Sequence, residues 1–207
     1  NLTAADMHGI SLSRANLRQA KMPGANLSRA VLAGADLSEA DLFAVNFDRA
    51  DLSLANLSKA DLRGAYLRGC RMRGANLRGS DLRGGTLMQS RRGDGIARVS
   101  ADLQDEPNLS RTASIAGANL QGTKLVKAQL IMCDFAGADL KGADLSEANL
   151  NGVNLSRVDA QGATFAKASL APVNMPMPNG QPSGRLWPAN LADANFQDCD
   201  FAGANLH

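Results

Sequence analysis

The chain has 207 residues, with 22 basic and 20 acidic side chains, a formal charge of +2, and only one Trp, one Tyr and six Phe. So few aromatic residues would stock a conventional globular core poorly, whereas a narrow solenoid needs only small and medium side chains. No stretch approaches the roughly 20 consecutive apolar residues of a membrane span, and no series resembles a signal peptide. We therefore expect no membrane span. The three widely spaced cysteines resemble no disulfide framework, which favours a reducing compartment, and we expect a cytoplasmic protein.

Residues 1–87 place a large apolar side chain at every fifth position, from Leu2 to Leu87. Units such as Ala25-Asn26-Leu27 read as small, Asp or Asn, large, followed by two free residues. A period of five leaves no apolar face on an α-helix and alternates between the two faces of a straight strand. The chain must therefore turn after every unit, and turning the same way each time builds stacked coils whose backbones pair about 4.8 Å apart.

The repeat is interrupted twice. The large residues Leu87 and Ile115 are 28 positions apart instead of five, and Met175 and Leu191 are 16 apart. We interpret both as loops that leave a single solenoid domain. The predicted organisation is repeats 1–87, loop 88–112, repeats 113–175, loop 176–188 and repeats 189–207.

These units resemble the pentapeptide-repeat proteins over nearly the whole chain. The resemblance implies an all-β fold, a right-handed quadrilateral β-helix with four units per coil. Thirty-five units then give almost nine coils with two inserted loops.

The sequence contains few of the side chains from which catalytic sites are usually built. The two histidines, His8 and His207, are too few and too far apart for a triad or a metal cluster. Cys70, Cys133 and Cys199 occupy small inward positions without a C-x-x-C spacing, which predicts buried thiols and no metal site. Asp alternates with Asn before the large residue, which indicates a need for a short polar group rather than a charge. We predict no enzyme activity, no cofactor and no metal.

Candidate partner-binding residues fall into three groups. Five arginines follow five successive large residues and should encircle the rod as a basic collar that binds phosphates or an acidic protein; alternatively they only solvate the outer face. An outward apolar patch and the two loops are the other candidates, with Trp187 either contacting a partner or packing back on the rod. The residues are Arg63, Arg68, Arg73, Arg78 and Arg83 for the collar, Val126, Ile131 and Met132 for the patch, and Arg91, Arg92, Met177 and Trp187 for the loops.

The leading functional hypothesis is a noncatalytic scaffold or adaptor rod that binds a protein partner through loops and exposed patches. A resemblance to the Qnr group, which carries two projecting loops, implies an alternative partner, DNA gyrase or topoisomerase IV, bound by imitating DNA. Charge speaks against it, since residues 1–87 carry twelve basic and eight acidic groups, and only residues 113–207 reverse this, with six and eight. Nucleic-acid binding through the collar is a second alternative, and uncapped terminal coils would permit an end-to-end homodimer.

Overall fold

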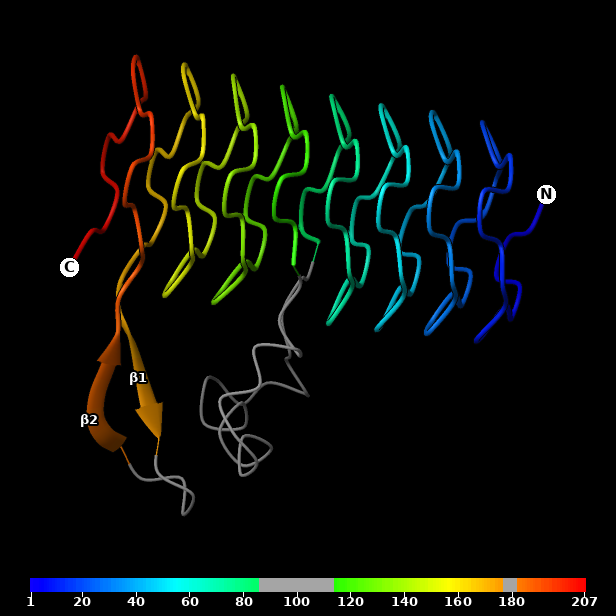
Figure 1. Ribbon diagram of the computed structural model, residues 1–207, viewed down its shortest axis with the longest axis horizontal. Coiled ribbons are helices and arrows are strands. Elements are labelled where there is room, and N and C mark those ends of the chain that lie inside the picture. Colours follow the sequence, from blue (N-terminus) through cyan, green and yellow to red (C-terminus); the bar gives the residue numbers. More distant parts are fainter. Residues whose placement is uncertain (86–113, 177–181) are drawn as a thin grey trace.

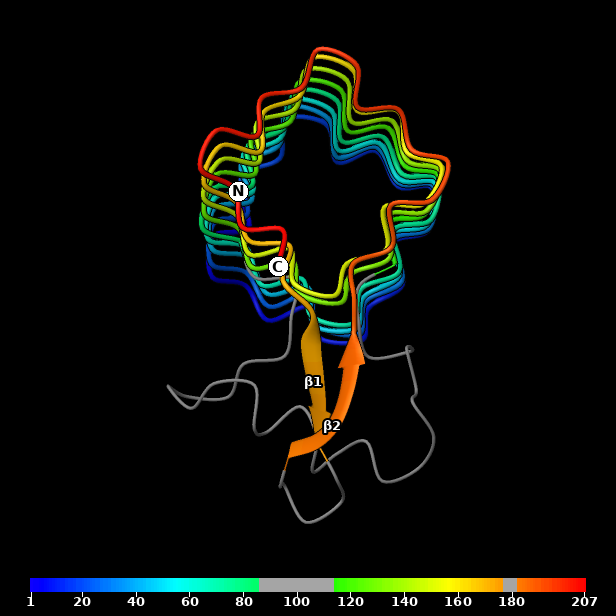
Figure 2. The same cartoon turned by 90° about the vertical axis from the view of Figure 1, so that its left-hand side faces the viewer.

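The computed structural model describes residues 1–85, 114–176 and 182–207. They form a rod of stacked coils, with the two chain ends at opposite ends of the rod (Figure 1). Parallel bridges join residues that lie twenty positions apart, such as Asp6 with Asn26 and Asn26 with Asn46. Twenty residues are four pentapeptides, so each coil has four sides, which Figure 2 shows as a four-cornered outline.

Each unit closes with a tight turn that explains the period of five. In the unit centred on Leu27, the backbone N–H of Ala30 donates to the Leu27 carbonyl over 3.1 Å, and Arg29 has a φ of 58°. A positive φ is typical of the third residue of a type II turn. Asn26 Oδ1 accepts the N–H of Ser28 at 3.2 Å, and the N–H of Leu27 donates to Asn46 of the next coil at 2.7 Å.

We call the residue before each large residue the rung residue, because it forms the bridge to the neighbouring coils. Where the rung residue is Asp or Asn, its side-chain oxygen caps the following turn, as Asp36 does by accepting the N–H of Ser38 at 3.0 Å. Asp and Asn are equivalent in this role, since each offers an Oδ1 at the same distance from the backbone.

Small and large side chains fill the interior in alternation, as at Ala25 and Leu27, which are both fully buried. Cys70 and Cys133 are buried in the small inward positions, as the sequence predicts, whereas Cys199 is only half-buried. Ala160 occupies a large position and is also fully buried. Phe196 occupies the corresponding position in the next coil, because the N–H of Ala160 donates to Asn195 at 2.8 Å.

An aromatic cluster surrounds this irregular position. Phe196 meets the ring of Phe165 edge to face at 5.7 Å between centroids, and Phe165 stacks on Phe201 at 4.8 Å. A small residue in one coil is thus followed by large rings in the next.

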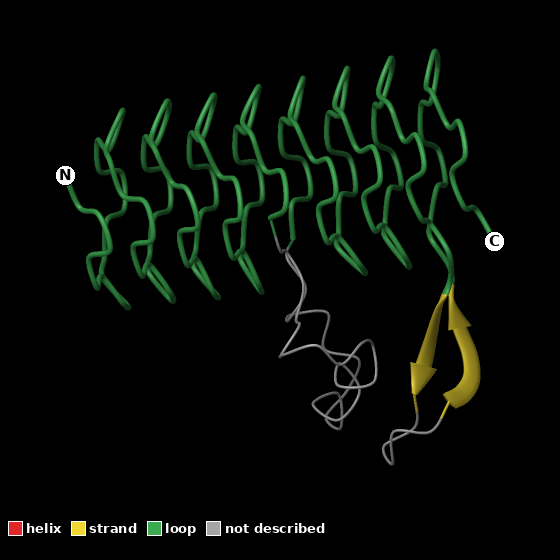
Figure 3. Cartoon of the chain, turned by 180° about the vertical axis from the view of Figure 1, so that it is seen from behind, coloured by secondary structure: helices red, strands yellow, loops and turns green. Residues whose placement is uncertain are grey.

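A two-stranded antiparallel hairpin projects from the side of the rod (Figure 3). Strand β1 runs Val173–Pro176 and strand β2 runs Pro182–Trp187. Val173 pairs with Trp187 at the base of the hairpin, and Met175 pairs with Arg185. Met175 is therefore a strand residue and not the centre of a repeat, and the predicted boundary between repeat and loop at residue 175 is wrong.

Proline chemistry explains why the coil stops earlier, after Leu170. Pro172 stands at the position where the turns have a positive φ, and the proline ring holds φ near −65°. The turn after Leu170 therefore cannot close in the usual way. The coil resumes at Asn190, which forms the bridge to Asn154.

Both interruptions lie on the same edge of the rod. The first returns at Ser114, which bridges to Asp134, and the second returns at Asn190, which belongs to the same stack of rung residues as Asp134 and Asn154. We call the edge of the rod that directly precedes these four residues the insertion edge. Two ordinary turns, Ile131–Met132 and Asn151–Gly152, lie on it between the interruptions. No helix in the described ranges is long and apolar enough to span a membrane.

Candidate partner-binding site

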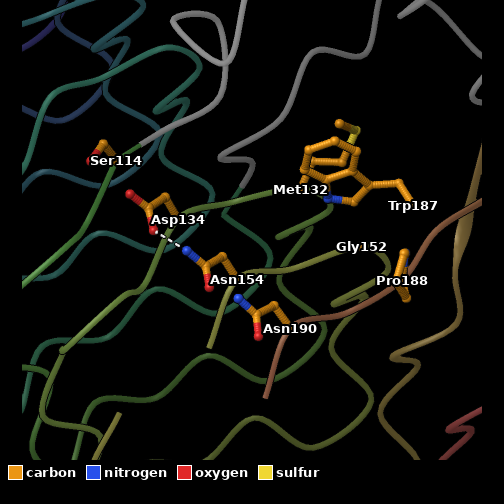
Figure 4. A pocket seen from close by; sticks show the side chains of 8 residues that line it. All are labelled: Ser114, Met132, Asp134, Gly152, Asn154, Trp187, Pro188 and Asn190. Carbon is orange, nitrogen blue, oxygen red and sulfur yellow. Dashed lines mark hydrogen bonds between the residues drawn. The ribbon is translucent and has the colours of Figure 1, made fainter. Parts of the chain in front are cut away.

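A groove of about 590 Å³ lies along the insertion edge at the base of the hairpin. Its polar side consists of the rung residues Ser114, Asp134, Asn154 and Asn190, which form a row in Figure 4. Its apolar side consists of Met132, Gly152, Trp187 and Pro188. The groove combines hydrogen-bonding groups with apolar surface, as protein-binding surfaces do.

Among the described residues that line the groove, only Asp134 has an ionisable side chain. Its Oδ1 accepts the Nδ2–H of Asn154 at 2.9 Å and the backbone N–H of Ala136 at 3.1 Å. No partner within the described part of the chain reaches Oδ2 or forms an ion pair with Asp134. This carboxylate oxygen can therefore accept a hydrogen bond from a bound molecule.

Trp187 packs on the rod and also remains partly accessible. A Cβ atom added to Gly152 would lie 3.1 Å from Trp187 Cδ1 and 3.0 Å from Val173 Cγ2, so both side chains sit against this glycine. Trp187 nevertheless keeps 38% of its surface exposed. The two interpretations of Trp187 from the sequence are therefore compatible, because one part of the residue packs while another lines the groove.

The predicted apolar patch is not an exposed surface. Ile131 and Met132 are each only 8% exposed and form a small cluster with Val173. They lie on the insertion edge, where the base of the hairpin covers them. Val126 is half-buried and belongs to the preceding turn of the coil, on a neighbouring edge. The expectation that these residues are solvated together is wrong, because the sequence gives no sign that the hairpin folds over them.

The five arginines of the predicted collar are distributed around the rod, since the coil period of twenty residues puts Arg63 and Arg83 on one edge and the others on the remaining three. Arg63 pairs with Asp61 at 2.6 Å and Arg83 with Asp81 at 2.7 Å. Arg68 lies 3.7 Å from Asp48, and its side chain is only 12% exposed. Arg73 and Arg78 form no ion pair with another described residue.

Arg63 and Arg83 have a structural role, which is to neutralise neighbouring aspartates. Asp41, Asp61 and Asp81 are rung residues stacked in successive coils, about 4.8 Å apart, so their carboxylates repel one another. The hydrogen bond from Arg63 lowers the pKa of Asp61 against the opposing effect of burial, and Asp61 in turn raises the pKa of Arg63. Arg63 and Arg83 thus neutralise an acidic stack, which leaves them less available to bind phosphates.

Three candidates, Arg91, Arg92 and Met177, lie outside the described residues and stay predictions. Among the residues described, no three His, Cys, Asp or Glu side chains gather in a way that could hold a metal ion.

The sequence-based candidates did not include Asp134, Asn154 or Gly152. The sequence does contain a signal for this part of the groove, namely the number of repeat units between the two interruptions. Twelve units, from Ile115 to Leu170, separate the two interruptions once Pro172 is recognised as the break. Twelve is a multiple of the four units in a coil, so both interruptions must leave from one edge.

Comparison with known proteins agrees with this architecture. A family model described as pentapeptide repeats matches residues 10–49, 46–84, 113–152, 133–170 and 188–207. The chain belongs to the pentapeptide-repeat family. Pentapeptide-repeat proteins form right-handed quadrilateral β-helices, and they are generally structural or binding proteins rather than enzymes. The predicted fold class is confirmed at this level.

Two solved structures of pentapeptide-repeat proteins illustrate the likeness. The plasmid-mediated fluoroquinolone resistance protein QnrB1 is 19% identical, with a TM-score of 0.64, over 100% of this chain and 84% of that chain. HetL, a protein involved in heterocyst differentiation regulation in Nostoc sp. strain PCC 7120, is 29% identical, with a TM-score of 0.44, over 98% of this chain and 87% of that chain. No curated protein matches the sequence significantly. The likeness to QnrB1 establishes the fold alone.

Proposed function

We propose that this protein is a noncatalytic binding rod, a repeat solenoid with two insertions, whose insertion edge contacts a partner protein. The observation that carries the proposal is that both interruptions return to the rod in one stack of rung residues, at Ser114 and Asn190. Insertions that leave the rod at one edge can contact the same surface of a partner, which insertions on opposite edges could not do.

The hairpin adds exposed apolar surface to this edge. Leu186 is 62% exposed and Trp187 is 38% exposed. Trp is favoured among the residues that contribute most to binding at protein interfaces. The groove beside the hairpin extends the same surface onto the rod.

Register-preserving replacements of the insertions test the proposal. Bridges 43 and 36 residues apart, in place of twenty, show that 23 and 16 extra residues interrupt the coil. Replacing residues 88–112 by Ser-Gly removes the 23 extra residues of the first insertion, and replacing residues 171–188 by Ser-Gly removes the 16 of the second. Each replacement restores a regular five-residue unit. Gln161→Arg is the control, because Gln161 is exposed on the diagonally opposite edge.

The readout is affinity capture from the source lysate, with circular dichroism to verify that each variant folds. We expect each replacement to lose a partner that the intact chain and the Gln161→Arg variant retain. If all variants capture the same proteins, the insertion edge is not the binding surface.

A second candidate partner is DNA gyrase or topoisomerase IV. Two insertions on one edge support it, because the Qnr group to which the sequence has a resemblance carries two projecting loops. The formal charge of +2 speaks against it, because a protein that imitates DNA should carry net negative charge, and we therefore rank it below the general adaptor role. Retention of purified gyrase or topoisomerase IV by the intact chain, but by neither replacement variant, would make this the specific function.

Direct nucleic-acid binding ranks last, since Arg63 and Arg83 each pair with a neighbouring aspartate. We propose a cytoplasmic location for the binding activity, on the basis of three widely spaced cysteines that resemble no disulfide framework.

A further inference from the structure

The groove on the insertion edge has a chemistry that suggests what part of a partner it takes. We propose that it binds an extended segment of the partner protein that presents an arginine or lysine side chain to Asp134 and Trp187. This inference rests on the proposed function, because it names the kind of segment that the insertion edge recognises.

Groove length favours an extended segment. The row from Ser114 through Asp134 and Asn154 to Asn190 spans three successive bridges along the rod, or about 14 Å at the usual spacing of neighbouring strands. An extended chain advances about 3.3 Å per residue, so about four residues fit along the row. Side-chain amides and the Asp134 carboxylate in this row can bond to the main chain of such a segment.

Charge favours a basic side chain. Asp134 gives the described lining of the groove a single negative charge, and no described lysine or arginine lines it. The nearest cation in the same stack is Arg71, two rungs away, and its Nη2 already lies 3.2 Å from Asp51 Oδ2. An arginine or lysine in the groove would therefore meet a carboxylate that has no ion-pair partner among the described residues, and no described cation would compete with it.

The apolar side of the groove supports the same side chain. Trp187 lines the groove opposite the row of rung residues (Figure 4). An indole face attracts a guanidinium or ammonium group, and Met132 and Pro188 offer apolar contact to the aliphatic stem of a long basic residue. An acidic side chain would be repelled by Asp134 and would meet no compensating cation among the described residues that line the groove.

Trp187 is the only tryptophan of the chain, so its fluorescence reports on the groove directly. The probes are three blocked peptides, Ala-Arg-Ala-Leu-Ala and the same sequence with Gln or Glu in place of Arg, titrated to about 5 mM because such short peptides bind weakly. We expect a saturable change of Trp187 fluorescence with the Arg peptide, a weaker one with Gln and none with Glu.

Asp134→Asn tests the charge without removing the turn cap. Stacked asparagines are tolerated elsewhere in the rod, since Asn46 Nδ2 donates to Asn26 Oδ1 at 3.2 Å. We expect this variant to bind the Arg peptide about fivefold more weakly, the effect of one partly exposed ion pair, and the Gln peptide unchanged. Asp144→Asn is the matched control, because Asp144 caps its own turn in the same way on a different side of the rod.

Equal binding of the three peptides, no fluorescence change with any of them, or an unaltered Asp134→Asn variant would overturn the inference. The proposed function would survive each of these results if replacement of either insertion still abolished capture of the partner. If both replacement variants still captured the partner, the proposed function would be refuted, whatever the peptide titration showed.

Discussion

The contact between the hairpin and the rod can be tested at a single atom. In Gly152→Ala, the new Cβ would lie 3.0 Å from Val173 Cγ2 and 3.1 Å from Trp187 Cδ1, so these side chains must move. Gly142→Ala is the matched control, because the two glycines have similar φ values, 63° and 60°, and a Cβ at Gly142 meets nothing within 4 Å. Only the contact with the hairpin distinguishes the two variants.

Both substitutions place an alanine in the left-handed region, which costs about 1 to 2 kcal/mol. Gly152→Ala adds the cost of overpacking, about 1 to 3 kcal/mol if the hairpin stays in place, or less if its base lifts away. In either case Trp187 changes its surroundings in Gly152→Ala and keeps them in Gly142→Ala.

Trp187 emission and its quenching by acrylamide provide the assay, alongside urea unfolding followed by circular dichroism. We expect a red-shifted and more readily quenched Trp187 in Gly152→Ala alone. Identical emission and identical unfolding midpoints for the two variants would refute the packing of the hairpin on Gly152.

Three further predictions concern the rod itself. Ala160→Leu should lower the free energy of unfolding by about 1 to 3 kcal/mol, because Phe196 already fills the space above this buried position, and a second change, Phe196→Leu, should recover part of the loss in urea unfolding. The hydrogen bond to Arg63 lowers the pKa of Asp61, so the stability that Asp61 contributes is present above the ordinary carboxyl pKa and is lost as the pH falls through the lowered value. The thermal midpoint of Asp61→Asn should therefore depend less on pH below about 4 than that of the unmodified chain. An identical pH profile for the two proteins would contradict this. Leu54→Gly should leave the thermal midpoint unchanged or raise it slightly, since Leu54 is 73% exposed with a φ of 59°, and a clear loss of stability would show that its side chain contributes packing.

The regular part of the rod could be predicted from the sequence because one local rule repeats in every unit. The large residue turns inward, the rung residue caps the turn, and the next coil supplies the backbone partners, as the unit around Leu27 shows. Each of these interactions involves residues at fixed spacings, so periodicity alone contains them.

The groove could not be predicted in this way, because it depends on how the hairpin folds back. Val173-Asn174-Met175 has the composition of a repeat unit, yet it forms β1 because Pro172 prevents the preceding turn. Ile131 and Met132 occupy outward positions in the repeat and are buried only because the hairpin covers them. Long-range packing of an insertion leaves no periodic trace in the sequence.

Photocrosslinking from two positions tests the central claim most directly. A photoreactive amino acid is placed at Leu186, which is exposed on the hairpin, and in a separate protein at Gln161, which is exposed on the diagonally opposite edge. Binding at the insertion edge predicts that the captured partner is crosslinked from position 186 and not from position 161. Crosslinking from position 161 alone, or equally from both positions, would contradict the account.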